Sequence, residues 1–213
     1  MKRLLILSLA LLMLLCGCKA EKNEETAKPA EVVAKAAQDG SIATSELKIL
    51  SQEKRGDELI TCYDPEKYYD LPVRQFDNGV AAFHLETDYS YSELIDELGE
   101  TGIVATGSAT GIREGHLSEA NAYTITEFTV DKLYYGEENA AVIRVQECYA
   151  LASQSGRTFY RCVIGTCKPM RNDSPMLLLL KYQNGVYLPI IDPISLENPT
   201  EKGAELLEKL NIQ

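Results

Sequence analysis

Cysteine and histidine are the residues of this chain that could carry nucleophilic, redox or metal chemistry. The sequence has six cysteines and only two histidines, His84 and His116. A thiol within hydrogen-bond reach of an imidazole forms a nucleophile with its base, and Cys62 with His84 is the pair to consider. Two histidines in 213 residues need no catalytic explanation, however. We expect His84 to be packed or edge-exposed in an apolar strand and His116 to lie in a solvated loop.

Four cysteines beyond residue 18 are candidates for disulfides: Cys62, Cys148, Cys162 and Cys167. Four cysteines allow three pairings. One pairing closes Cys162 onto Cys167 across a tight turn, where the backbone geometry allows it. Another joins Cys148 to Cys162 on neighbouring strands and leaves Cys62 for Cys167. The spacing matches neither a C-x-x-C redox motif nor paired zinc knuckles, so we expect one or two structural disulfides and no metal or cofactor.

The N-terminal residues have the pattern of an export signal. Lys2 and Arg3 form a basic start, and residues 4–15 are apolar or small with one exception, Ser8. A basic start followed by an apolar stretch of this length is typical of a signal peptide. The stretch is too short to span a bilayer, which needs about 20 apolar residues.

The next residues, Leu15-Cys16-Gly17-Cys18, resemble the lipobox of bacterial lipoproteins. The resemblance implies cleavage after Gly17 and a diacylglycerol on the Cys18 sulfur. Cys16 does not fit as the lipidated residue, because Leu15 is too bulky for the cleavage position. Two acyl chains give stable membrane anchoring, whereas one gives reversible binding. We therefore expect a protein anchored at Cys18 to the extracytoplasmic face of the cell membrane; a secretory signal cut elsewhere is the alternative.

The composition divides the chain into three parts. Residues 1–17 are the signal peptide, and residues 18–56 are the lipidated cysteine and a flexible linker, whose first part is polar and lacks apolar periodicity. Residues 57–213 are expected to form a single β-rich domain, because apolar runs and turn signals alternate from there on. The linker would hold that domain near the lipid surface.

The expected strands are short and separated by turn signals: 59–63, 80–85, 103–112, 123–133, 141–148, 158–164, 176–182 and 186–191. Asn184-Gly185 is a typical hairpin turn between the last two. Gly107 and Gly111 lie inside the third strand, and internal glycines mark bulges or bends. No βαβ pattern occurs. The sequence therefore predicts a mainly β fold, either a small antiparallel barrel (OB-like) or a sandwich, with the barrel favoured by the glycines.

Two helices accompany these strands. Ser90 and Glu93 form a capping box, and apolar residues at helical spacing follow it, so the sequence predicts an internal helix over 91–98. Asn198 as N-cap and Pro199 at the first helical position predict a C-terminal helix. Its apolar stripe consists of Leu206, Leu207 and Leu210.

A second resemblance covers about residues 89–191. It is to an uncharacterised β-rich domain of secreted proteins and lipoproteins of Gram-positive bacteria. It rests on strand patterns, which are Ile103-Val104-Ala105-Thr106-Gly107-Ser108-Ala109-Thr110, Phe128-Thr129-Val130-Asp131-Lys132-Leu133-Tyr134-Tyr135-Gly136, Ile143-Arg144-Val145, Met176-Leu177-Leu178-Leu179-Leu180 and Gly185-Val186-Tyr187. The resemblance implies no established activity and therefore no catalytic residues.

Charge and motifs limit the function further. The net charge of -11 disfavours a protein that binds the nucleic-acid backbone. No nucleophile elbow, P-loop or H-E-x-x-H motif occurs, and the acids have no EF-hand spacing. We expect a non-catalytic binding or accessory domain for a small-molecule, cell-wall or protein ligand. The alternatives are an assembly factor that reads proteins through its tyrosine-rich segment around Tyr68 and Tyr69, and a Cys62–His84 hydrolase.

Overall fold

The computed structural model describes residues 42–43, 48–75, 90–162 and 169–212. Within these ranges the strands are β1 (Ile42–Ala43), β2 (Ile49–Arg55), β3 (Glu58–Tyr63), β4 (Val73–Gln75), β5 (Ile103–Leu117), β6 (Ala122–Tyr135), β7 (Val142–Glu147), β8 (Tyr149–Gln154), β9 (Arg157–Cys162), β10 (Pro175–Gln183), β11 (Val186–Pro189) and β12 (Ile194–Ser195). The helices are α2 (Tyr91–Leu98) and α3 (Glu201–Lys209), with a short 3₁₀ turn at Pro65–Lys67. The mainly β prediction with two helices is confirmed.

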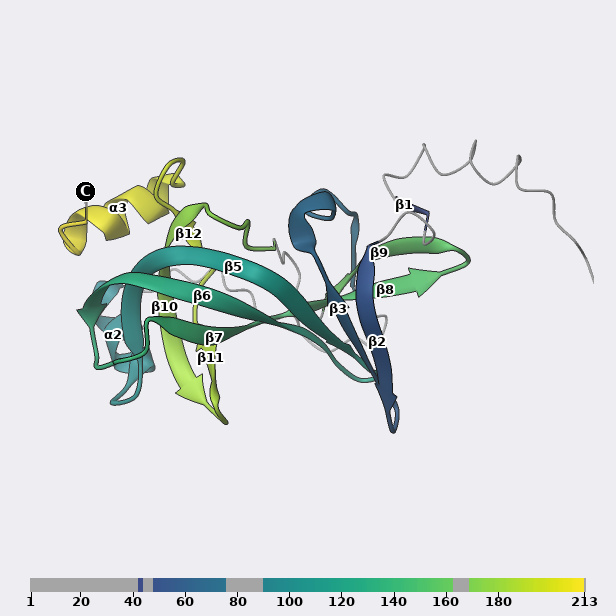
Figure 1. The fold of residues 1–213 in the computed structure, drawn as a ribbon. Coiled ribbons are helices and arrows are strands. Elements are labelled where there is room, and N and C mark those ends of the chain that lie inside the picture. The colour runs from purple at the N-terminus through teal and green to yellow at the C-terminus, as the bar shows by residue number, and fades with distance from the viewer. Residues whose placement is uncertain (1–41, 44–47, 76–89, 163–168, 213) are drawn as a thin grey trace, which may run out of the picture.

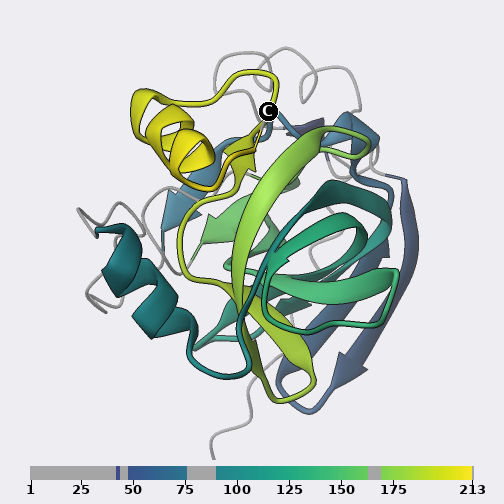
Figure 2. The same cartoon turned by 90° about the vertical axis from the view of Figure 1, so that its left-hand side faces the viewer.

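Five strands form a closed ring of hydrogen bonds. The order is β5-β6-β7-β11-β10, and β10 pairs with β5 to complete the path. All neighbours are antiparallel except β7 and β11, which are parallel. Figure 2, seen from the helical end, shows the strands curling around this path.

Strand β12 pairs with the start of β10 near α3, and the other strands lie on the side away from the helices (Figure 1). The hairpin β2–β3 adds to the second half of β5, so β2 is the edge of the large sheet. A second sheet contains β8, β9, β4 and β1. The long strand β5 therefore belongs to the ring through its first half and to the β2–β3 extension through its second half.

Gly107 explains how β5 can bend so closely over β6. A Cβ added there would lie 1.9 Å from the Thr129 carbonyl oxygen and 2.8 Å from the Phe128 ring. The pairing of β5 with β6 also shifts register at Thr106/Gly107 and again between Thr110 and Glu114. The predicted irregularities at Gly107 and Gly111 are thus confirmed as bulges in a strand that extends further, to Leu117.

Three clusters of buried side chains make the core. The first draws on all five ring strands: Ile103, Ala105, Ala109, Phe128, Ile143, Val145, Met176, Leu178, Leu180 and Tyr187, joined by Met170. The second lies under the helices: Leu94, Leu98, Val104, Leu177, Leu179, Ile194, Leu206, Leu207 and Ile212. The third connects the β2–β3 hairpin to the second sheet: Tyr63, Tyr68, Leu71, Tyr149, Leu151, Tyr160 and Cys162.

Local signals place most helix and turn ends correctly. Ser90 caps α2 with both bonds of the predicted capping box, and Gly99 ends the helix at φ +63°. Asn184 and Gly185 both have positive φ, as the hairpin turn requires. The start of α3 is a correction, because its N-cap is Thr200, whose hydroxyl accepts from the Gly203 N–H. The sequence pattern predicts Asn198, two residues earlier.

The linker prediction also needs correction, because residues 49–55 form β2 rather than a flexible segment. Five of its residues, Ser51 to Arg55, are polar or charged, and nearly the whole strand is exposed. A strand at a sheet edge with this composition lacks the apolar alternation that identifies strands in a sequence. The expected strand at 80–85, the signal peptide and Cys18 lie outside the described residues. In the part of the chain that the structure describes, no helix is long and apolar enough to cross a membrane.

Candidate functional site

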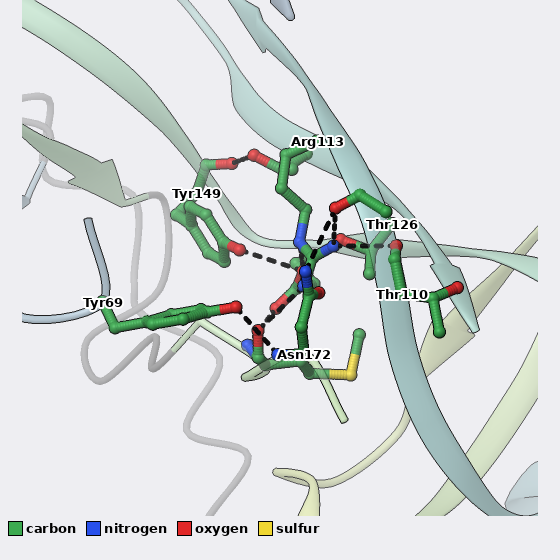
Figure 3. Close-up of polar contacts among 10 residues, drawn as sticks. Tyr69, Thr110, Arg113, Thr126, Tyr149 and Asn172 are labelled. Atoms are coloured by element: carbon green, nitrogen blue, oxygen red, sulfur yellow. Dashed lines mark hydrogen bonds and ion pairs between the residues drawn. The ribbon is translucent and has the colours of Figure 1, made fainter. Parts of the chain in front are cut away.

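A buried carboxylate, Glu147, lies where β7 ends and faces the interior. Its Oε1 accepts hydrogen bonds from the Thr126 hydroxyl and, at 2.9 Å, from the Tyr149 hydroxyl. Its Oε2 accepts from the Met170 backbone N–H at 2.8 Å. Figure 3 shows two of these donors, Thr126 and Tyr149, on either side of Arg113. Both carboxylate oxygens are therefore occupied by internal partners.

Arg113 lies beside this carboxylate and is fully buried. Its guanidinium nitrogens Nη1 and Nη2 donate to four acceptors at 2.8–3.1 Å, namely Thr110 O, Gly111 O, Met170 O and Asn172 Oδ1. Its Nε is 3.9 Å from Glu147 Oε1, within range of an ion pair but too far for a hydrogen bond. Arg113 therefore binds mostly neutral oxygens, and Glu147 balances its charge from a short distance.

Together the two side chains hold the backbone of Met170. Glu147 accepts a hydrogen bond from the Met170 N–H, and Arg113 donates one to the Met170 C=O. In a sheet, a neighbouring strand would usually make these two backbone hydrogen bonds. The Asn172 N–H is held by the Tyr69 hydroxyl at 2.8 Å. A buried backbone group without a partner is strongly destabilising. The main consequence of this buried polar centre is thus structural: it ties residues 170–172 to β5 and β7.

Burial dominates the electrostatics of the centre. It raises the pKa of the Glu147 carboxyl, while the Arg113 charge and the three hydrogen-bond donors act to lower it. Burial and the Glu147 charge likewise raise the pKa of Tyr149 well above its ordinary value. A perturbed pKa often marks a catalytic group. Here, however, Glu147 is only 6% exposed, and both its oxygens already have partners among the described residues.

A second polar cluster lies on the outer face of β3, β5, β6 and β7. The His116 ring stacks on Tyr123 with centroids 4.4 Å apart and an interplanar angle of 7°. Its Nε2 is 2.7 Å from Glu114 Oε1, and its Nδ1 is 3.2 Å from Glu58 Oε1. Tyr123 donates to that same Glu58 oxygen at 3.3 Å. The ring thus lies between two carboxylates, with an aromatic platform beneath it.

This outer-face cluster is accessible to solvent at its rim. The side chains of Arg144 and Glu114, 3.9 Å apart, are 55% and 42% exposed. Burial and the Glu58 charge raise the pKa of Tyr123. The cluster offers an aromatic edge, carboxylate acceptors and a guanidinium donor, which together can bind a polar ligand. The prediction of a solvated loop at His116 is wrong, because His116 belongs to β5 and is 9% exposed.

The cysteines predicted to form disulfides differ in their oxidation state. Cys162 is disulfide-bonded, whereas Cys62 and Cys148 both carry thiols. The alternative that pairs Cys148 with Cys162 and Cys62 with Cys167 is therefore wrong. The register of β8 with β9 places Tyr149, not Cys148, opposite Cys162, so the Cys148 side chain is one position out of step.

The structure describes only some of the other candidate cysteine and histidine residues. Cys62 lies on β3 opposite Glu114, and burial raises the pKa of the Cys148 thiol to about 11. Cys167, His84 and Cys18 lie outside the described residues, so the Cys62–His84 pair stays a hypothesis.

Two tyrosines of the tyrosine-rich segment lie in the interior. Tyr63 and Tyr68 are 0% and 1% exposed, and their rings pack edge to face with centroids 5.7 Å apart. Tyr69 is half-buried and binds the Asn172 backbone. Tyr68 is therefore not available to contact another protein.

Apart from His116 and Tyr69, the residues of the two polar clusters are not singled out by the sequence analysis, although one signal is present. Ile143, Val145 and Glu147 share one face of β7, and the first two are buried, so the parity of the strand places Glu147 inside. No comparable signal links Arg113 to Glu147, which lie on different strands.

Within the described ranges no group of three or more histidine, cysteine and acidic side chains could hold a metal ion. Comparisons of the chain with models of known protein families, with curated proteins and with solved structures find no match.

Proposed function

We propose that this chain is a bacterial lipoprotein, anchored by a diacylglycerol on Cys18 to the extracytoplasmic face of the cell membrane. Its β-rich domain binds a ligand or partner and catalyses no reaction. The observation that carries the anchoring is Leu15-Cys16-Gly17-Cys18, placed directly after a basic start and an apolar stretch of signal-peptide length. The domain behind the anchor begins by residue 49, where β2 starts.

The interior arrangement supports a binding role over a catalytic one. Glu147 and Arg113 are the strongest candidates for a catalytic acid and an electrostatic stabiliser. Their polar atoms, however, form hydrogen bonds with the Met170 backbone and with neighbouring groups. A catalytic group must reach its substrate at hydrogen-bond distance. Because both side chains are enclosed, they support the fold of the domain rather than a reaction.

The outer-face cluster is the surface that we propose for binding. Tyr123 and Glu114 present an aromatic edge and a carboxylate, and Arg144 adds a charged donor. Tyrosine and arginine are enriched where proteins recognise ligands and partners. The four strands that carry these side chains are hydrogen-bonded neighbours, so the surface is preformed.

The anchor is tested by replacing single cysteines. The full chain is expressed in a bacterium that is fed a fatty acid bearing a chemical handle, and acylation is followed on a gel. Cys18→Ser is expected to abolish labelling and to release the protein from the membrane fraction. Cys16→Ser is the matched control and keeps its label. Labelling that persists in the Cys18 variant, or that depends on Cys16, would contradict the proposal.

Binding is tested by thermal shift on the chain without its signal peptide and with Cys18→Ser. The panel contains cell-wall fragments, oligosaccharides and peptides. A ligand at one hundred times its dissociation constant stabilises the fold by about 2.7 kcal/mol, a readily measured shift. Tyr123→Ala and Arg144→Ala should reduce the shift, whereas Tyr182→Ala, which changes an exposed residue of β10, should not. A ligand whose shift is unaffected by both cluster variants binds elsewhere.

A protein partner is the second candidate for this surface, because an exposed arginine and an aromatic edge also suit a protein interface. It predicts no shift for any small compound and a crosslinked partner on intact membranes, lost in Arg144→Ala. Turnover of a wall fragment or peptide by the purified domain would instead favour the Cys62–His84 hydrolase and contradict the non-catalytic proposal.

A further inference from the structure

Three buried polar groups around Glu147 have no hydrogen-bond partner among the described residues. They are the hydroxyls of Tyr63 and Tyr160 and the Nε of Arg113. The three side chains are at most 1% exposed. A buried donor or acceptor without a partner typically destabilises a protein by about 1–3 kcal/mol, so native structures rarely leave such groups unsatisfied. Three of them in one place point to a shared partner.

The three groups lie close together although they come from different strands. Tyr63 on β3 pairs directly with Arg113 on β5, so their side chains share the interior face of the sheet. Tyr160 on β9 packs against Tyr149 with ring centroids 4.8 Å apart, and the Tyr149 hydroxyl binds Glu147. Burial and the Glu147 charge raise the pKa of Tyr63, whereas the nearby side chains of Thr124, Arg113 and Tyr160 act to lower it. The unsatisfied atoms therefore surround one region of the interior.

The chemistry of these atoms defines what is needed. An arginine Nε can only donate, whereas a phenolic hydroxyl can donate or accept. The missing partner must therefore present a lone pair to Arg113. Glu147 Oε1 does not supply it, because the gap of 3.9 Å between that oxygen and Arg113 Nε is too long for a direct hydrogen bond.

We propose that a single internal water molecule binds between Arg113 Nε and the hydroxyls of Tyr63 and Tyr160. It accepts the Arg113 N–H and exchanges hydrogen bonds with the two hydroxyls. A buried water usually makes about three such bonds, which is the number available here. This inference is independent of the proposed function.

Charge favours water over a halide ion, the other small species that accepts from such donors. Glu147 already balances the charge of Arg113, and its nearest oxygen is 3.9 Å away. A halide would place a second negative charge beside that carboxylate in the interior, where an uncompensated charge is strongly unfavourable. A neutral water completes the hydrogen bonds without that repulsion.

The test is a crystal structure of the full chain at a resolution that shows ordered waters, grown once in chloride and once in bromide. We expect one density peak within about 2.7–3.2 Å of all three atoms, identical in both salts. An anomalous bromide peak there would show a halide site and overturn the proposal. A direct bond between the two hydroxyls, with no density between them, would overturn it as well.

A measurement in solution provides a second, independent test of the proposed water. Oxygen-17 relaxation dispersion of water counts long-lived internal waters, and the Tyr63→Phe/Tyr160→Phe double variant should hold one fewer than the unmodified chain. The control, Tyr182→Phe, alters an exposed hydroxyl and should leave the count unchanged. An equal count in the double variant would contradict the proposal. The unfolding transition of each variant is recorded first, so that only folded protein is compared.

Discussion

The buried ion pair shows how two charged side chains can serve the backbone. Arg113 and Glu147 are not joined by a direct hydrogen bond, because Arg113 Nε and Glu147 Oε1 are 3.9 Å apart. Each instead satisfies one polar group of Met170. Buried pairs often contribute little net stability, but removing one member leaves a charge without compensation. Replacing one of the two side chains should therefore have a larger effect on stability than the net contribution of the pair suggests.

Arg113→Met should destabilise the domain by about 3–5 kcal/mol, because it leaves the buried Glu147 charge and the Met170 carbonyl without their partner. Urea unfolding measures the change. Lys181→Met is the matched control. Lys181 pairs with Glu97 at 3.0 Å on the surface, where both side chains are about half exposed, so we expect a loss below about 1 kcal/mol. Equal losses in the two variants would show that burial of the pair has no special weight.

The loss in Arg113→Met should depend on pH. Burial raises the pKa of Glu147 above 4.5 and Arg113 lowers it, so the variant has the higher folded-state pKa. The folded variant therefore binds its proton more tightly, and the unmodified protein gains stability relative to it as the pH rises. Unfolding measured from acid to neutral pH should show a deficit that is smallest at or below about pH 4.5. A constant deficit would contradict a role for the Glu147 charge.

Among the elements, β5 has the most demanding path, since it serves both the ring and the β2–β3 extension. Its bulges and its close approach to β6 make this possible. Gly107 is required there because β6 leaves no space for a Cβ atom. Its backbone conformation is not the reason, since its φ is not in the left-handed region. The bend is thus a packing requirement of two strands.

Gly107→Ala should weaken the pairing of β5 with β6, because a Cβ would lie 1.9 Å from the Thr129 carbonyl oxygen. We expect it to destabilise the protein by about 1–3 kcal/mol more than Gly115→Ala does. Gly115 lies in the same strand, and a Cβ there meets only ordinary contacts, the nearest at 3.5 Å. Thermal unfolding of both variants provides the comparison, and a similar effect at the two positions would count against the close approach.

The start of α3 can be tested against the sequence pattern. Thr200→Ala removes the hydroxyl that accepts the Gly203 N–H and should reduce stability by about 1 kcal/mol. Asn198→Ala, at the position suggested by the sequence, should stay within about 0.5 kcal/mol of the unmodified protein. Urea midpoints distinguish the two, and the reverse order would restore Asn198 as the cap.

At the scale of the whole molecule, the disulfide and thiol states of the cysteines can be predicted. The chain is unfolded without reductant, alkylated and digested, and labelled cysteines are found by mass spectrometry. Cys62 and Cys148 should be labelled, and Cys162 only after reduction. In the folded protein at pH 8, Cys148 should react slowly, since its pKa is raised to about 11 and the thiolate is the reactive form. Labelling of Cys162 without reductant would contradict its disulfide.

The polar centre also joins parts of the fold that would otherwise meet only through apolar contacts. Met170 belongs to the ring core and Tyr149 to the core beneath the second sheet, and both bind Glu147. The connection is directional, because each donor must meet its acceptor. We infer that it helps specify how the second sheet is placed against the ring.

The parts of the fold that were predictable from the sequence depend on residues only a few positions apart. The Ser90–Glu93 capping box, the Asn184-Gly185 turn and the apolar stripe of Leu206 and Leu207 each involve a single turn or hairpin. Their physical cause is local, since a side chain satisfies a nearby N–H or a residue tolerates positive φ. The mainly β class follows from many such signals together.

Tertiary structure alone decided which strands become neighbours, and with that the composition of both polar clusters. Arg113 meets Glu147 because β5 and β7 flank β6, and His116 meets Glu58 because β3 pairs with β5. β2 was missed because an exposed edge strand needs no apolar alternation. Contacts between distant residues arise from the register and closure of the sheet, which are set by packing over the whole domain and have no signature within a short window of sequence.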